Sequence, residues 1–139
     1  MKDSKAARFA TLLIVVHGLI GAGHLFAHGD LGIETSAMQN LFIVVVIGLS
    51  PIAAAILLWT SSARKGFLLM AVAMAGSLLF GVYFHYIAIS PDHVSHLPAR
   101  ESQGLFRLTA LLLAIAEALG AGVGWWGYRR ITALSKKVL

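Results

Sequence analysis

The run FATLLIVVHGLIGAGHLFAH, residues 9–28, decides the fold because it is twenty residues long and lacks Asp, Glu, Lys and Arg. A helix needs about 20 apolar residues to cross the hydrocarbon core of a bilayer. Lipid offers no partner to backbone amides, so such a run must be helical. Three further runs of similar length are uncharged or nearly uncharged, at residues 41–60, 67–89 and 106–128. The sequence therefore predicts an all-α integral membrane protein with four transmembrane helices.

Composition supports a membrane protein with a single transmembrane domain over residues 1–139. Hydrophobic residues make up 58% of the chain and charged residues 12%, which lies outside the range of ordinary soluble domains. The connections between the runs are short, and short connections favour an up-down-up-down bundle. The chain has no cysteine, which excludes disulfides and thiolate metal sites.

The net charge of +5 is explained by membrane topology rather than by a nucleic-acid partner. Nine of the eleven Lys and Arg residues fall before the first span, between spans two and three, or after the fourth span. Arg100 and Arg107 alone lie on the other side. The positive-inside rule then predicts cytoplasmic N and C termini in a bacterial-type inner membrane, with histidine-rich loops outside.

Three histidines of the first span, His17, His24 and His28, differ by seven and four positions. At 100° per residue their side chains project within about 40° of one helix face. His24 and His28 are one turn apart, a spacing with which two helical imidazoles can bind one metal ion. His17 lies about 10 Å deeper and cannot join them.

The third span and the loop after it supply the remaining three histidines. His85 lies about one turn inside the outer boundary, near the depth of the two candidate ligands on the first span. Ser90 and Pro91 resemble an N-cap and a first helical position, so a short turn would place His93 and His96 on one side.

This histidine cluster predicts a transition-metal site at the outer end of the bundle. Imidazole and carboxylate without sulfur are typical of Zn, Cu(II), Ni or Fe(II) sites. Asp92 would orient one imidazole by accepting a hydrogen bond from the ring nitrogen that does not bind the metal. Uptake, sensing or delivery of the ion would be the role. The predicted metal ligands are His24, His28 and His85, with His93 and His96 as a lid or capture site.

A second interpretation is a haem b subunit that transfers electrons. His24 and His85 would be the axial ligands, and Gly21 and Gly81 would leave a bare patch one turn deeper for the macrocycle. Arg107, together with Arg100, would pair with the propionates. The ligand spacing is similar to one haem layer of membrane b-type cytochromes.

His17 and Glu117 both fall near the middle of the bilayer, where an unpaired carboxylate is costly. We expect the two side chains to pair between spans one and four. A structural hydrogen bond is the preferred interpretation, and a proton relay is the alternative.

Two faces of span four carry small residues every four positions, a pattern that lets helices approach closely in lipid. Packing within the bundle is the preferred interpretation, and a homo-oligomer or larger membrane complex is the alternative. The faces are Ala110, Ala114, Ala118 and Gly122, and Ala116, Gly120 and Gly124.

In a third functional class the chain would be an accessory subunit with structural histidines. No catalytic set stands out, so an enzymatic activity is expected only through a bound metal or haem.

Pro51 interrupts the second span after Ser50. Its missing N–H should leave the carbonyl of Ile47 unpaired, which predicts a bend or a pocket wall.

Overall fold

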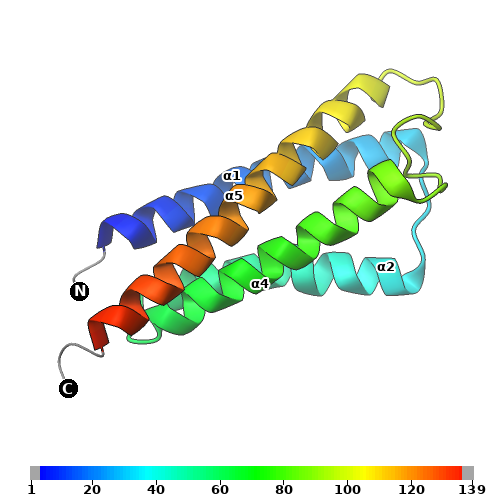
Figure 1. Ribbon diagram of the computed structural model, residues 1–139. Coiled ribbons are helices and arrows are strands. Elements are labelled where there is room, and N and C mark those ends of the chain that lie inside the picture. Colours follow the sequence, from blue (N-terminus) through cyan, green and yellow to red (C-terminus); the bar gives the residue numbers. More distant parts are fainter. Residues whose placement is uncertain (1–3, 136–139) are drawn as a thin grey trace.

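The computed structural model describes residues 4–135 and is helical, with no strand among these residues (Figure 1). The elements are α1 (Ser4–Leu31), α2 (Ala37–Phe42), η1 (Ile43–Leu49), α3 (Ser50–Leu58), α4 (Ala63–Val82), η2 (Tyr83–Ile87) and α5 (Gln103–Ser135), where η marks a π-helical segment.

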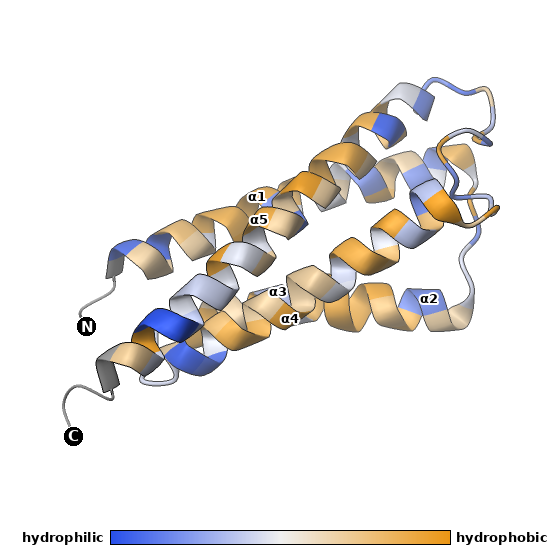
Figure 2. Ribbon diagram, viewed as in Figure 1, coloured by the Kyte–Doolittle hydropathy of each residue, from blue (hydrophilic) through white to orange (hydrophobic). Residues whose placement is uncertain are grey.

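Four helical stretches are long and apolar enough to cross a membrane, which confirms the all-helical prediction and the number of candidate spans. Each stretch begins three or four residues before its predicted run; the first and fourth also end after it, and the second and third end two residues short of it. Long polar side chains next to an apolar run can reach the interface, so the helix can continue there. Figure 2 shows hydrophobic residues along the middle of the bundle and hydrophilic residues toward its two ends. The stretches are Lys5–Leu31, Ala37–Leu58, Ala63–Ile87 and Gln103–Ala133.

Consecutive spans run in opposite directions, so α1 begins and α5 ends at the same end of the bundle (Figure 1). We call this the terminal end, and the opposite end, with the connections 32–36 and 88–102, the loop end. Helix α5 packs against α4 and α1, and α4 packs against α3. The principal contact of α1 with the second span is through α3.

Helices α4 and α5 approach closely at the terminal end because glycines face the packed surface. A Cβ on Gly124 would lie 2.6 Å from the backbone nitrogen of Ala71, and one on Gly120 would lie 2.8 Å from Cγ of Met74. This face of span four is therefore used inside the bundle. A Cβ on Gly122, on the other small-residue face, would meet nothing within 4 Å.

The second and third spans each contain a π-helical segment. Where η1 meets α3, the hydroxyl of Ser50 donates to the carbonyl of Val45 over 2.8 Å, and Pro51 is the next residue. The wider π turn accommodates the proline ring, which would otherwise clash with the carbonyl of Ile47. Both Ile47 and Pro51 line a cavity, as the pocket-wall prediction required.

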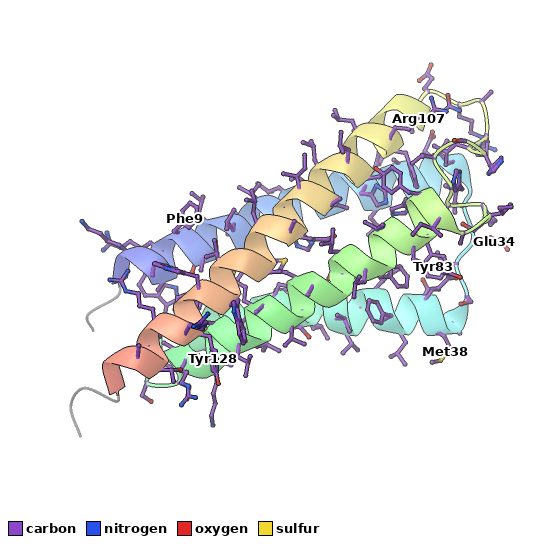
Figure 3. All side chains as sticks on the ribbon, viewed as in Figure 1. Phe9, Glu34, Met38, Tyr83, Arg107 and Tyr128 are labelled. Atoms are coloured by element: carbon purple, nitrogen blue, oxygen red, sulfur yellow. The ribbon has the colours of Figure 1, made fainter. Side chains whose placement is uncertain are left out.

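Connection 88–102 folds back over the loop end. Its residue Leu97 is buried in an apolar cluster with Ala27 and Leu31 of α1 and with Phe106 and Ala110 of α5. This cluster joins the connection to α1 and α5. Large apolar side chains are exposed around the sides of the bundle. Phe9, Met38 and Tyr83 are among those that are exposed and labelled in Figure 3.

Candidate metal centre

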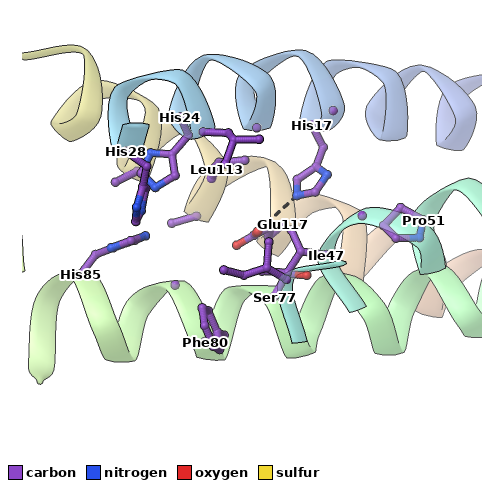
Figure 4. Close-up of a pocket in the computed structure, with 18 of the residues that line it drawn as sticks. His17, His24, His28, Ile47, Pro51, Ser77, Phe80, His85, Leu113 and Glu117 are labelled. Atoms are coloured by element: carbon purple, nitrogen blue, oxygen red, sulfur yellow. Dashed lines mark hydrogen bonds and ion pairs between the residues drawn. The ribbon is translucent and has the colours of Figure 1, made fainter. Parts of the chain in front are cut away.

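Three imidazoles from two spans converge near the loop end. His24 and His28 come from α1 and His85 comes from η2, and one ring nitrogen from each lies within 4.8 Å of the other two (Figure 4). The ring of His24 is 5.0 Å from each of the other two rings, measured between centroids. The side chains of His24 and His85 are buried, and that of His28 is partly buried. We call these residues the histidine triad.

The last turn of α1, which carries His28, is fixed by a glycine. Gly32 has a φ of +65°, which glycine adopts without steric cost. Its N–H donates to the carbonyl of Gly29 over 3.2 Å, and the N–H of Ile33 donates to the carbonyl of His28 over 3.2 Å. These two bonds form a Schellman motif, which ends the helix one turn after the ligand position.

The tautomer of His24 is set by Thr109 on α5. A hydroxyl has one proton, and Thr109 donates it to the carbonyl of Leu105 over 2.7 Å. The same Oγ1 lies 2.9 Å from Nδ1 of His24, so it accepts the N–H from this ring nitrogen. Nε2 of His24 then keeps its lone pair. This atom is buried and has no hydrogen-bond partner among the described residues.

The tautomer of His85 is set by the backbone of the loop. Nδ1 of His85 lies 3.2 Å from the carbonyl oxygen of Asp92, which can only accept, so Nδ1 carries the proton. The N–H of Val94 in turn donates to the carbonyl of His85 over 3.0 Å. Nε2 of His85 is therefore free to bind a ligand, as Nε2 of His24 is. Metal-ligating histidines commonly donate their second N–H in this way.

The carboxylate of Asp92 is a buried acidic group beside the triad. Its Oδ1 lies 3.5 Å from Nε2 of His28 and forms no hydrogen bond with the described residues. Burial raises the pKa of the Asp92 carboxyl, while the neighbouring imidazole of His85 acts in the opposite direction. A carboxylate in this position can orient His28 and partly compensate the charge of an ion held by the triad.

The remaining loop-end residues of the predicted sites lie outside the triad. His93 and His96 are neighbours, with ring centroids 4.8 Å apart, on the turns that follow Ser90. The hydroxyl of Ser90 donates to the carbonyl of Phe84 over 3.1 Å rather than capping a helix. Arg107 is exposed and donates to the carbonyl of Val94 over 2.9 Å (Figure 3).

A cavity of about 510 Å³ extends from the triad toward the middle of the bundle. Gly21 and Gly81 line it below the histidines, where their missing side chains leave space. A Cβ on Gly21 would meet nothing within 4 Å, and one on Gly81 would lie 3.8 Å from Cδ2 of His85.

His17 and Glu117 line the deeper part of the same cavity (Figure 4). Nε2 of His17 lies 3.2 Å from Oε1 of Glu117, and both side chains are buried. The structure therefore brings together the two polar residues that were expected to pair between spans one and four.

Two residues of the site were not predicted from the sequence. Thr109 fixes His24, and the ring of Phe106 packs against all three imidazoles, at centroid distances of 4.5, 5.0 and 5.2 Å. The signal for Thr109 was a lone hydroxyl in the outer part of span four. Nothing in the pattern of apolar residues distinguished Phe106.

Comparison with known proteins found no protein-family model, no curated protein and no solved structure that matches the chain.

Proposed function

We propose that this chain is a multi-pass protein of the cytoplasmic membrane that binds one transition-metal ion through His24, His28 and His85. The triad would lie near the outer surface, and the role would be uptake, sensing or delivery of Zn, Cu, Ni or Fe. The observation that carries the proposal is the convergence of three ring nitrogens within 4.8 Å of one another.

Insertion in a bilayer is supported by the apolar surface between the two ends. Leu19 is 70% exposed and Leu79 is 72% exposed, on helices that otherwise contain few charged residues. Soluble proteins rarely expose a continuous apolar belt of this kind. The excess of Lys and Arg at the terminal end supports cytoplasmic termini.

The chemistry of the triad suits a metal ion. Hydrogen bonds hold two of its imidazoles as Nδ1–H tautomers, so each presents a lone pair on Nε2. A tetrahedral ion with metal–nitrogen bonds of about 2.0–2.1 Å needs ligand nitrogens roughly 3.4 Å apart, which side-chain rotations can reach from the present separation. The unpartnered Nε2 of His24 is costly in a buried site unless a ligand uses it.

The same geometry favours an ion over haem. A porphyrin between His24 and His85 would have to occupy the space into which His28 also projects, since all three ligand nitrogens lie within 4.8 Å. A single ion uses all three. An absorption spectrum after addition of haemin tests this preference, because a bis-histidine haem would give a strong Soret band.

Metal binding can be tested by equilibrium dialysis of the purified protein with Zn²⁺ or Cu²⁺. We expect one ion per chain with micromolar or tighter affinity. The double variant His24→Ala/His28→Ala should lose this ion. The matched variant His93→Ala/His96→Ala should keep its equilibrium affinity and change at most the rate of capture. Unchanged affinity in the first variant would contradict the proposal.

A further inference from the structure

The cavity below the triad opens along a slit between the first and second spans. Six exposed residues that line it mark this slit: Gly29 and Asn40 near the loop end, and Gly18, Leu25, Gly48 and Ile52 deeper in the bundle. Leu25 is 69% exposed and Ile52 is 56% exposed, so the deeper lips of the slit are apolar.

Two apolar clusters border the triad and the cavity below it. Beside the histidines, Leu97 and Phe106 are buried in an apolar cluster that joins α1, α5 and connection 88–102. Toward the terminal end, a second cluster that includes Ile14, Phe67 and Met74 fills the bundle. With the chain in a bilayer, the deeper part of the slit, between Leu25 and Ile52, would face lipid, and its loop-end part would lie at the interface.

The lining of the cavity is polar at the loop end and mostly apolar in the middle, and the paired side chains of His17 and Glu117 lie at its deep end. The triad and Asp92 occupy the loop end, and Ile47, Leu113 and Phe80 line the space toward the middle. A volume of about 510 Å³ is in the range of small-molecule sites, which is about 300–1,000 Å³. The shape and polarity fit a molecule with a compact polar head and an apolar chain.

Three protein ligands also leave a coordination position of a tetrahedral ion open, as in catalytic zinc sites. Neutral imidazoles leave the charge of a divalent ion uncompensated, and the one carboxylate beside the triad, that of Asp92, compensates it only in part. Because a buried charge is costly without an opposite charge, the open position favours an anionic oxygen donor.

We infer that the cavity binds a single-chain amphiphile that enters from the bilayer between α1 and η1, and that its anionic oxygen-donor head completes the coordination of the triad's metal. This inference rests on the proposed function and adds the class of ligand to it. The acyl chain would pass Gly21 and Gly81 and end near His17 and Glu117.

The inference can be tested with the cobalt-loaded protein in phosphatidylcholine nanodiscs, because the visible absorption of Co²⁺ reports a change in its ligands. Octanohydroxamate is the amphiphilic probe, and acetohydroxamate is the same head group without the chain. In the wild-type protein we expect octanohydroxamate to shift the cobalt spectrum at a concentration well below that needed for acetohydroxamate.

Partition of octanohydroxamate into lipid would by itself produce part of this gain, so a cavity variant is needed. In Gly21→Leu the new side chain projects into the open space of the cavity. The matched control is Gly122→Leu, which also enters open space but lies outside the cavity lining. Gly21→Leu should weaken the binding of octanohydroxamate roughly tenfold or more, because the leucine displaces methylene groups of the probe's alkyl chain. It should leave the affinities for cobalt and acetohydroxamate unchanged. Gly122→Leu should leave the affinities for cobalt, acetohydroxamate and octanohydroxamate unchanged.

Each outcome separates the two proposals. If the wild-type protein and both glycine variants bind cobalt and octanohydroxamate alike, the alkyl chain of the probe lies in bulk lipid. The inference is then wrong, while the proposal of metal binding stands. If neither hydroxamate changes the cobalt spectrum, the open position does not accept an oxygen donor and the inference is also wrong. A wild-type protein that binds no cobalt overturns the metal proposal and this inference together.

Discussion

Thr109 and His24 form a hydrogen bond between α5 and α1, with Oγ1 of Thr109 2.9 Å from Nδ1 of His24. The bond decides which ring nitrogen of His24 is available to a ligand. Helix α5 supplies no triad residue, but this bond connects it to the centre of the site. The rotation of α5 therefore determines which ring nitrogen of His24 can bind a ligand.

Thr109→Val should weaken metal binding about 10- to 100-fold, the effect typical of losing a residue that orients a metal-ligating histidine. Thr109→Ser keeps the hydroxyl and should bind nearly as the wild type does. Thr132→Val is a matched control, since Thr132 also donates to the carbonyl four residues earlier on α5, over 2.8 Å, far from the site. Equilibrium dialysis measures all three. Equal affinity in the wild type and Thr109→Val would show that the tautomer is not set by this bond.

Asp92→Asn should reduce metal affinity by about tenfold, because it removes the buried negative charge beside His28 while preserving the shape of the side chain. Since burial raises the pKa of the Asp92 carboxyl, the difference between wild type and variant should shrink as pH falls and the carboxyl becomes neutral. Asp30→Asn removes one charge from an exposed residue at the same end and should have little effect. A larger loss in Asp30→Asn than in Asp92→Asn would contradict this assignment.

Glu117→Leu should destabilise the fold by about 1–3 kcal/mol, because it leaves the buried imidazole of His17 without its hydrogen-bond partner. Glu117→Gln can still bond to His17 and should cost less. Neither change should alter metal affinity, because His17 is not part of the triad. Unfolding of the purified protein in mixed micelles gives the free energies. A Leu variant as stable as the wild type would remove the structural interpretation of the pair and leave the proton relay.

Alanine at two neighbouring glycines of α5 should have opposite effects on stability. Gly124→Ala places a Cβ 2.6 Å from a backbone atom of Ala71, so α4 and α5 must separate, at a cost of about 1–3 kcal/mol. Gly122→Ala meets nothing within 4 Å and should stabilise the helix by about 0.5–1 kcal/mol. The same unfolding measurement checks both. Equal destabilisation would indicate that the exposed face of Gly122 is occupied, as in an oligomer.

Much of the fold could be predicted from the sequence because the length of an apolar run is set by the bilayer and not by tertiary contacts. The four spans follow from this length, and the shared face of His24 and His28 follows from helical periodicity. The proximity of His85 to them followed from counting depth along two spans, since residues at equal depth on neighbouring helices can meet.

The rest depends on how each helix is rotated and on how a loop folds, which periodicity does not specify. Two faces of span four carry small residues, and only packing determines that the face of Gly120 and Gly124 contacts α4. The same rotation places Thr109 beside His24. The π-helical turns of η2 and the return of connection 88–102 place the carbonyl of Asp92 at His85, and both arise from contacts between residues that form no local pattern.

The central claim is that imidazoles from two different spans bind one ion, and X-ray absorption spectroscopy of the zinc-loaded protein tests it most directly. The wild-type spectrum should show three imidazole nitrogens at about 2.0–2.1 Å from zinc, and His85→Ala should reduce the number to two or abolish binding. A zinc spectrum dominated by oxygen ligands, or one that His85→Ala leaves unchanged, would contradict the account.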